Sequence, residues 1–199
     1  MNLLNYDNPV LQKINRMVDA VWLNLLFLIF SLPLITAGAS MTAFYATYEK
    51  VFVKEKGKIW ACFWNSFLQN FRQATVIWLT ELLLLIVIGA DGWIMYQFIK
   101  NGVFLGNFYI LFMVFGVLLV IWGCYLFPYV SHFADSTRKV FENTARLAIA
   151  YIFSSILLLI ILLAVLAAIY VMPLSIFFAP VIGVMGFYKV LEPIFDRYS

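Results

Sequence analysis

Charged residues are scarce in this sequence of 199 residues: Asp, Glu, Lys and Arg together make up 12% of it. Soluble domains contain about 25% charged and about 45–50% apolar residues. This chain is 65% hydrophobic, and its mean hydropathy is +0.97. So much apolar surface could not be buried in one water-soluble domain of this size, and it excludes a disordered chain as well. The composition therefore predicts an all-α fold, a polytopic transmembrane helical bundle.

Histidine and cysteine are almost absent. His132 is the sole histidine, and the two cysteines, Cys62 and Cys124, lie in amphipathic and apolar stretches rather than in exposed loops. One histidine without a cysteine or carboxylate cluster does not build a usual metal centre, and two such cysteines do not suggest a disulfide framework. The sequence also shows no nucleophile–base set, phosphate-binding loop or nucleic-acid-binding pattern. We therefore expect no catalytic residue, no metal site, no cofactor, no nucleic-acid partner and no enzyme activity.

Long apolar runs dominate the chain instead. A spanning helix needs about 17–25 residues, and four runs meet that requirement. A fifth run is short and interrupted by Pro180, and a sixth is only mildly apolar. The segments that we predict to span the membrane are 17–35, 38–53, 74–97, 104–130, 147–172 and 173–189. They would form a single integral-membrane domain over residues 1–199.

The distribution of basic residues favours six spans over the alternative of five. The N-terminal segment carries Lys13 and Arg16, and the stretch from Lys50 to Arg72 carries five basic residues. Under the positive-inside rule both belong in the cytoplasm, which requires residues 17–53 to cross twice as a hairpin. Every basic residue except Lys100 then lies on the cytoplasmic side, together with both termini.

The predicted hairpin has suitable residues for its turn. Pro33 ends the first helix, and Gly38 and Thr42 lie four residues apart, so the second helix can pack its backbone closely against a neighbour. A signal peptide with a cleavage site at residues 37–39 is the competing interpretation. It is less favoured because it would place the basic residues of the 50–58 stretch outside the cell.

Two segments show the pattern of amphipathic helices at the cytoplasmic surface. In residues 58–72 apolar side chains recur at helical spacing, and amides lie on the opposite side. Such an aromatic-rich helix is typical of one that lies in the headgroup plane, whereas the alternative is that it forms the first turns of the next span. Its defining residues are Trp60, Trp64 and Phe67 on the apolar side and Asn65, Gln69, Asn70 and Arg72 on the polar side. Residues 133–145 repeat the pattern more weakly.

Three polar side chains stand out in or near the predicted spans: Asn24, Glu81 and Asp91. Glu81 lies inside its span, where an isolated carboxylate costs at least about 2.5 kcal/mol. It is either a proton, cation or ligand site or a structural group satisfied by a partner such as Asn24, Thr80 or a tyrosine, and we favour the structural interpretation slightly. Asp91 is expected at the outer interface beside Trp93, where aromatic residues gather.

Three stretches carry a resemblance to a known family. They are NLLFLIFSLPLITAGASMTAFY (24–45), FWNSFLQNFRQATVIWL (63–79) and FENTARLA (141–148). With them the chain resembles, over nearly its whole length, the YesL family of small bacterial multi-pass membrane proteins of unknown function. The resemblance implies a location in the bacterial cytoplasmic membrane and an association with carbohydrate uptake. It provides no catalytic residue to carry over.

Two functions remain in view from the sequence. The first is an accessory or partner-binding component of carbohydrate uptake, whose partners would be the lipid bilayer and either an ABC-type sugar transporter component or a second copy of the chain. The alternative is a small solute transporter or channel that uses Glu81 within the bundle. The cytoplasmic aromatic segments and near absence of outer loops favour the first, and Glu81 and the Pro- and Gly-interrupted last span favour the second.

Overall fold

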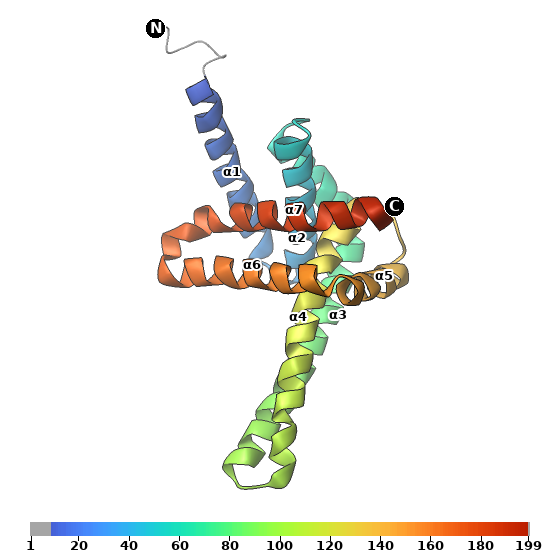
Figure 1. The fold of residues 1–199 in the computed structure, drawn as a ribbon. Coiled ribbons are helices and arrows are strands. Elements are labelled where there is room, and N and C mark those ends of the chain that lie inside the picture. The colour runs from blue at the N-terminus through green and yellow to red at the C-terminus, as the bar shows by residue number, and fades with distance from the viewer. Residues whose placement is uncertain (1–8, 199) are drawn as a thin grey trace.

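The computed structural model describes residues 9–198, and these residues are helical with short connections and no strand. The helices are α1 (Pro9–Ser31), α2 (Ala37–Thr47), α3 (Ile59–Lys100), α4 (Tyr109–His132), α5 (Thr137–Ala150), α6 (Ile152–Val171) and α7 (Ala179–Tyr198) (Figure 1). Short helical turns join them: η1 (Leu34–Thr36), η2 (Tyr48–Val53, a π-helix), η3 (Phe104–Phe108) and η4 (Pro173–Phe177).

Helices α1 and α2 form a hairpin that turns just after Ser31. The Thr36 hydroxyl donates to the Phe30 carbonyl (2.7 Å) and so satisfies an acceptor at the end of α1, where the helix leaves carbonyls unpaired. Across the hairpin, the Ser40 hydroxyl donates to the Phe27 carbonyl (3.0 Å). The Thr42 hydroxyl bonds within α2, to the Gly38 carbonyl (3.1 Å).

Helix α2 is the centre of the molecule, because every residue in it except Met41 is buried. Its closest neighbour is α3, and Gly38 is where the two backbones approach. A Cβ built on Gly38 would lie 2.5 Å from the Trp78 Cβ and 2.6 Å from the Ala74 carbonyl oxygen. Only glycine fits at this contact, and this supports the close packing that the sequence predicted there.

Helix α3 differs from expectation, since it runs without a break for 42 residues. At about 1.5 Å per residue it is about 63 Å long, roughly twice the thickness of a bilayer's hydrocarbon core. The expected separate surface helix at 58–72 is therefore the first part of α3, which was the alternative interpretation. No Pro or Gly interrupts residues 59–88, so nothing in the local sequence ends the helix there.

The second amphipathic segment is a separate helix. Helix α5 covers Thr137–Ala150 instead of 133–145, and Tyr151 (φ −110°, ψ 53°) separates it from α6. The loop before α5 is held by side chains: the Tyr129 hydroxyl donates to Asp135 Oδ2 (2.7 Å), and Asn143 Nδ2 donates to the Tyr129 oxygen (2.8 Å).

Two long hairpins extend from the central region and cross each other steeply (Figure 1). One is α3 with α4, and the other is α6 with α7. Their outer surfaces are strongly apolar, far beyond the patch sizes that soluble monomers expose. Exposed apolar residues on them include Leu83, Ile86, Val87, Met113, Val114, Val117, Ile156, Ile160 and Leu163. Such a surface suits contact with lipid.

Within residues 9–198, four segments are long and apolar enough to cross a membrane. They are Gln12–Ser31, Ile59–Lys100, Phe104–His132 and Ile152–Val171. They match four of the six predicted spans in position, which supports a membrane protein. The other two predicted spans correspond to α2 with η2 and to η4 with α7, and neither meets the same criteria of length and hydropathy.

Candidate functional site

An apolar cavity of about 440 Å³ lies between the central helix and the two long hairpins. Five helices contribute most of its wall. The lining includes Met41, Phe44 and Tyr45 of α2, Trp78, Glu81 and Leu85 of α3, Gly123, Cys124 and Phe127 of α4, Leu162, Val165 and Leu166 of α6, and Gly183, Val184 and Phe187 of α7. The volume is in the range of small-molecule sites, and almost all of the surface is apolar.

Glu81 provides the carboxyl group of this cavity. Its side chain is only 4% exposed, and its Oε2 atom has no hydrogen-bond partner among the residues that the structure describes. Opposite it lies Gly123, where a Cβ would be 1.9 Å from Glu81 Oε1. The absence of a side chain at Gly123 is thus what makes room for the carboxyl group.

The partners that the sequence suggested for Glu81 bond elsewhere. Asn24 Nδ2 donates to the Phe177 carbonyl (2.6 Å), and the Thr80 hydroxyl donates to the Val76 carbonyl within α3 (2.9 Å). Asn24 is fully buried and joins α1 to the turn before α7, while its own Oδ1 has no partner in residues 9–198. These contacts assign Asn24 a structural bond and give Thr80 a partner other than Glu81.

Asp91 lies apart from this region, in the distal half of α3, and is partly exposed. Trp93 and Tyr96 follow it with ring centroids 6.2 Å apart, and the Lys100 ammonium lies 4.8 Å from the Tyr96 ring. This grouping of an acid, two aromatic rings and a lysine is typical of a helix end at a membrane interface.

The aromatic side of the 58–72 segment packs mainly on protein. Phe63 and Phe67 are buried against Phe30 of α1, with ring centroids 5.6 and 5.2 Å away. Trp60 stays 49% exposed and stacks on Trp64 (5.8 Å).

On the polar side of the same segment, Asn65, Gln69 and Arg72 are exposed. Asn70 is less available to a partner, because its side-chain amide already donates to the Ser66 carbonyl (3.0 Å). The open polar surface is therefore smaller than the sequence predicted.

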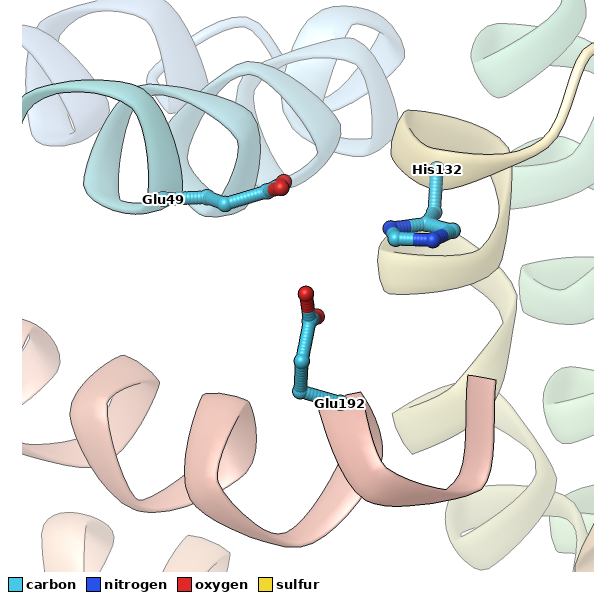
Figure 2. Close-up of side chains that lie close together, drawn as sticks. All are labelled: Glu49, His132 and Glu192. Atoms are coloured by element: carbon cyan, nitrogen blue, oxygen red, sulfur yellow. The ribbon is translucent and has the colours of Figure 1, made fainter. Parts of the chain in front are cut away.

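A second polar group forms where α4 ends. Glu49 of η2, His132 at the last position of α4 and Glu192 of α7 point toward one another (Figure 2). One donor atom from each lies within 4.8 Å of the other two. The expectation that His132 has no carboxylate cluster near it is therefore wrong.

The two carboxyl groups of this cluster are largely shielded from water. Glu49 is 6% exposed and pairs with the Lys54 ammonium. The Glu192 carboxyl group lies beside the Glu49 carboxylate, and the His132 imidazole is close to both. Glu192 Oε2 is buried and has no hydrogen-bond partner in the described part of the chain.

Sequence reasoning missed this group because its members lie far apart along the chain. One signal was available: each residue lies near the predicted cytoplasmic end of a different span, namely 38–53, 104–130 and 173–189. Side chains at the same membrane surface can meet, but hydropathy does not say which spans are neighbours.

Among the comparisons with known proteins, one protein-family model matches, and it covers only part of the chain. No curated protein and no solved structure matches it. A protein-family model described as "Protein of unknown function, DUF624" matches residues 20–92, from the middle of α1 into the distal half of α3. That segment includes Asn24, Gly38, Glu49 and Glu81, so the chain is similar to this family across the α1–α2 hairpin and the carboxyl group of the cavity.

Proposed function

We propose that the chain is a multi-pass membrane protein that binds a small, largely apolar solute in the cavity between α2 and the two long hairpins, with Glu81 as the polar anchor. The observation that carries this proposal is the carboxyl group of Glu81, buried at the wall of a 440 Å³ apolar cavity with Oε2 unpaired among the described residues. Transport of the solute is the activity that such a site would serve.

The energetic argument rests on desolvation. A carboxyl group inside a membrane costs at least about 2.5 kcal/mol, and an unsatisfied polar atom costs about 1–3 kcal/mol. A solute with an N–H or O–H group would offset part of this cost by donating to Glu81. The apolar lining would bind the remainder of the solute by burying its surface.

Native mass spectrometry of the protein, purified gently from its membrane, tests this proposal. Wild type should retain a small molecule, and Glu81→Leu should lose it because leucine accepts no hydrogen bond. Glu81→Gln distinguishes the chemistry, since glutamine keeps an acceptor for a neutral donor but cannot pair with an ammonium group. Glu142→Gln, on the exposed side of α5, is the matched control. Retention by Glu81→Leu equal to wild type would refute the proposal, as would a wild type that retains nothing.

For the membrane arrangement we propose six spans in the bacterial cytoplasmic membrane, with both termini in the cytoplasm. Helix α2 with η2, and η4 with α7, would supply the two short spans. The ion pair between Arg16 and Glu55 supports this, because it joins the N-terminal part of α1 to the loop after η2. These two basic segments therefore lie at the same end, as a hairpin requires.

An accessory role in carbohydrate uptake is the second candidate function. The exposed polar side chains Asn65, Gln69 and Arg72 next to the half-exposed Trp60 favour it, because tryptophan and arginine often anchor interfaces. The DUF624 match is consistent with the YesL resemblance, from which the association with an ABC-type sugar transporter component, or with a second copy of the chain, is inferred.

Copurification from native membranes tests the accessory role. A sugar-transport component should copurify with wild type and be lost from the double variant Asn65→Lys and Gln69→Lys, whose side chains already face outward. A partner that remains bound to this variant would show that the polar side of α3 is not the docking surface.

A further inference from the structure

We propose that Glu49, His132 and Glu192 bind a divalent transition-metal ion of the Zn²⁺ type at the end of α4. This inference is independent of the solute proposed for the cavity. It rests on the convergence of three ligand-type side chains from three separate helical elements, shown in Figure 2.

The geometry is close to that of a metal site. The three donor atoms lie within 4.8 Å of one another. Ligands about 2.1 Å from a tetrahedral ion are about 3.4 Å apart, so a contraction of about 1 Å by side-chain rotation would complete the site. Glutamate side chains have the rotatable bonds for this adjustment, and each of the three residues offers at least one donor atom.

The donor set selects the class of metal. One imidazole nitrogen with carboxylate oxygens suits Zn²⁺ and neighbouring first-row ions, whereas Mg²⁺ prefers oxygen donors and keeps most of its water. With three protein ligands, the fourth position of a tetrahedral ion would be left for water or another ligand, as in catalytic rather than structural zinc sites.

Two independent observations indicate that the group would accept a cation. Glu192 Oε2 is buried without a hydrogen-bond partner in the described residues. Glu49 is more than nine-tenths buried beside this second carboxylate, and its neutralising partner is the Lys54 ammonium from the exposed loop. A divalent ion would satisfy both carboxylates at once, and Lys54, half-exposed, can turn toward water when it releases Glu49.

A metal ion here would also fix the region beside the cavity. It would join η2, α4 and α7, all of which continue into the cavity wall. Tyr45, which lines the cavity, has its ring 6.1 Å from that of Tyr188, one turn before Glu192. The proposed site therefore lies next to the cavity but shares no residue with it.

The test uses the full chain in lipid nanodiscs, purified with a tag that contains no histidine. Because His132 is the sole histidine, ¹³C-histidine labelling gives one imidazole signal for the native protein. Zn²⁺ should shift this signal, and competition with a fluorescent zinc chelator should show binding at micromolar or lower Zn²⁺. A tenfold excess of Mg²⁺ should not compete.

Variants then assign the ligands. His132→Gln and Glu192→Gln should each weaken Zn²⁺ binding by at least about 100-fold, since even the loss of an outer partner of a metal ligand costs about 10–100-fold. Lys54→Met should strengthen binding, because it removes the competing ammonium from Glu49. Cys62→Ser and Glu142→Gln are the controls for adventitious zinc and should bind as wild type does.

Two outcomes would overturn the proposal. One is a wild-type imidazole signal that does not respond to Zn²⁺, a result that needs no variant to fold. The other is Zn²⁺ affinity that survives His132→Gln unchanged or disappears with Cys62→Ser, which would place the ion elsewhere.

Discussion

At the scale of single residues, Gly123 and Glu81 form a matched pair in which the small residue makes room for the acidic one. The sequence singled out Glu81 because a carboxylate within an apolar run is conspicuous. It did not single out Gly123, because a glycine in a membrane helix has many uses and its partner lies on another helix. The sequence did not indicate the group of Glu49, His132 and Glu192 for the same reason, because each of these residues lies on a different helical element.

The pair leads to a first prediction, on Gly123→Ala. The new Cβ would overlap the Glu81 carboxyl group and should destabilise the protein by about 1–3 kcal/mol. In a Glu81→Ala background the same change should be neutral or stabilising, because alanine favours a helix by about 1 kcal/mol over glycine. Thermal unfolding of the four proteins in one detergent measures the coupling. Equal costs in both backgrounds would show that the two residues do not interact.

At the scale of elements, the positions of the helices were largely predictable, and their continuity was not. Apolar runs and the Pro33 turn located α1, α2, α4 and α6 because hydropathy and proline act locally. The segment 58–72 is amphipathic in either arrangement, so its pattern cannot distinguish a surface helix from the start of α3. In the structure the aromatic rings of this segment pack on Phe30 of α1. This contact joins residues distant in sequence, so a local pattern does not predict it.

The continuity of α3 is testable by a distance measurement. Spin labels at the exposed positions Ala61 and Ala90 should be about 44 Å apart on one continuous helix, because each residue adds about 1.5 Å. If residues 58–72 instead lay at right angles to the rest, the distance would be about 31 Å. Electron–electron double resonance in nanodiscs distinguishes these values, and a peak at the shorter one would contradict the structure.

The contact between α2 and α3 gives a third prediction. Gly38→Ala should destabilise the protein by about 1–3 kcal/mol or more, since the Cβ would meet the Ala74 carbonyl and the Trp78 Cβ, and neither atom can turn away. Gly89→Ala, in helix α3 and with no neighbouring atom within 4 Å, is the control and should be neutral or stabilising. A chemical or thermal melt that finds the two variants alike would contradict this account of the contact.

At the scale of the whole molecule, charge patterning predicts the sidedness, and hydropathy alone does not. The Arg16–Glu55 ion pair joins the two segments that the positive-inside rule assigns to one side. Lys100, the exception among basic residues, lies at the opposite end of the α3–α4 hairpin (Figure 1). The steep crossing of the hairpins could not be foreseen, because it depends on the packing of side chains between segments rather than on any local pattern.

Sidedness gives the fourth prediction. In a background that lacks native cysteines, single cysteines at Lys56, Asn101 and Arg138 should differ in labelling of intact cells by a membrane-impermeant maleimide. Position 101 should react, and positions 56 and 138 should react only after the membrane is opened. Labelling of position 56 in intact cells would rule out the α1–α2 hairpin as a double crossing.

The steep crossing of the two hairpins has a consequence for the surrounding bilayer. Spanning helices tilt on average by about 20° from the membrane normal, and two hairpins that cross steeply cannot both meet that value. If both hairpins span the membrane, as we propose, at least one of them leans strongly, which shortens the thickness that it spans and suits a helix as long as α3. In that arrangement the lipids beside the leaning hairpin would thin or bend to cover its apolar surface. The protein would then impose a local deformation on the membrane and be favoured where the bilayer is already thin or curved.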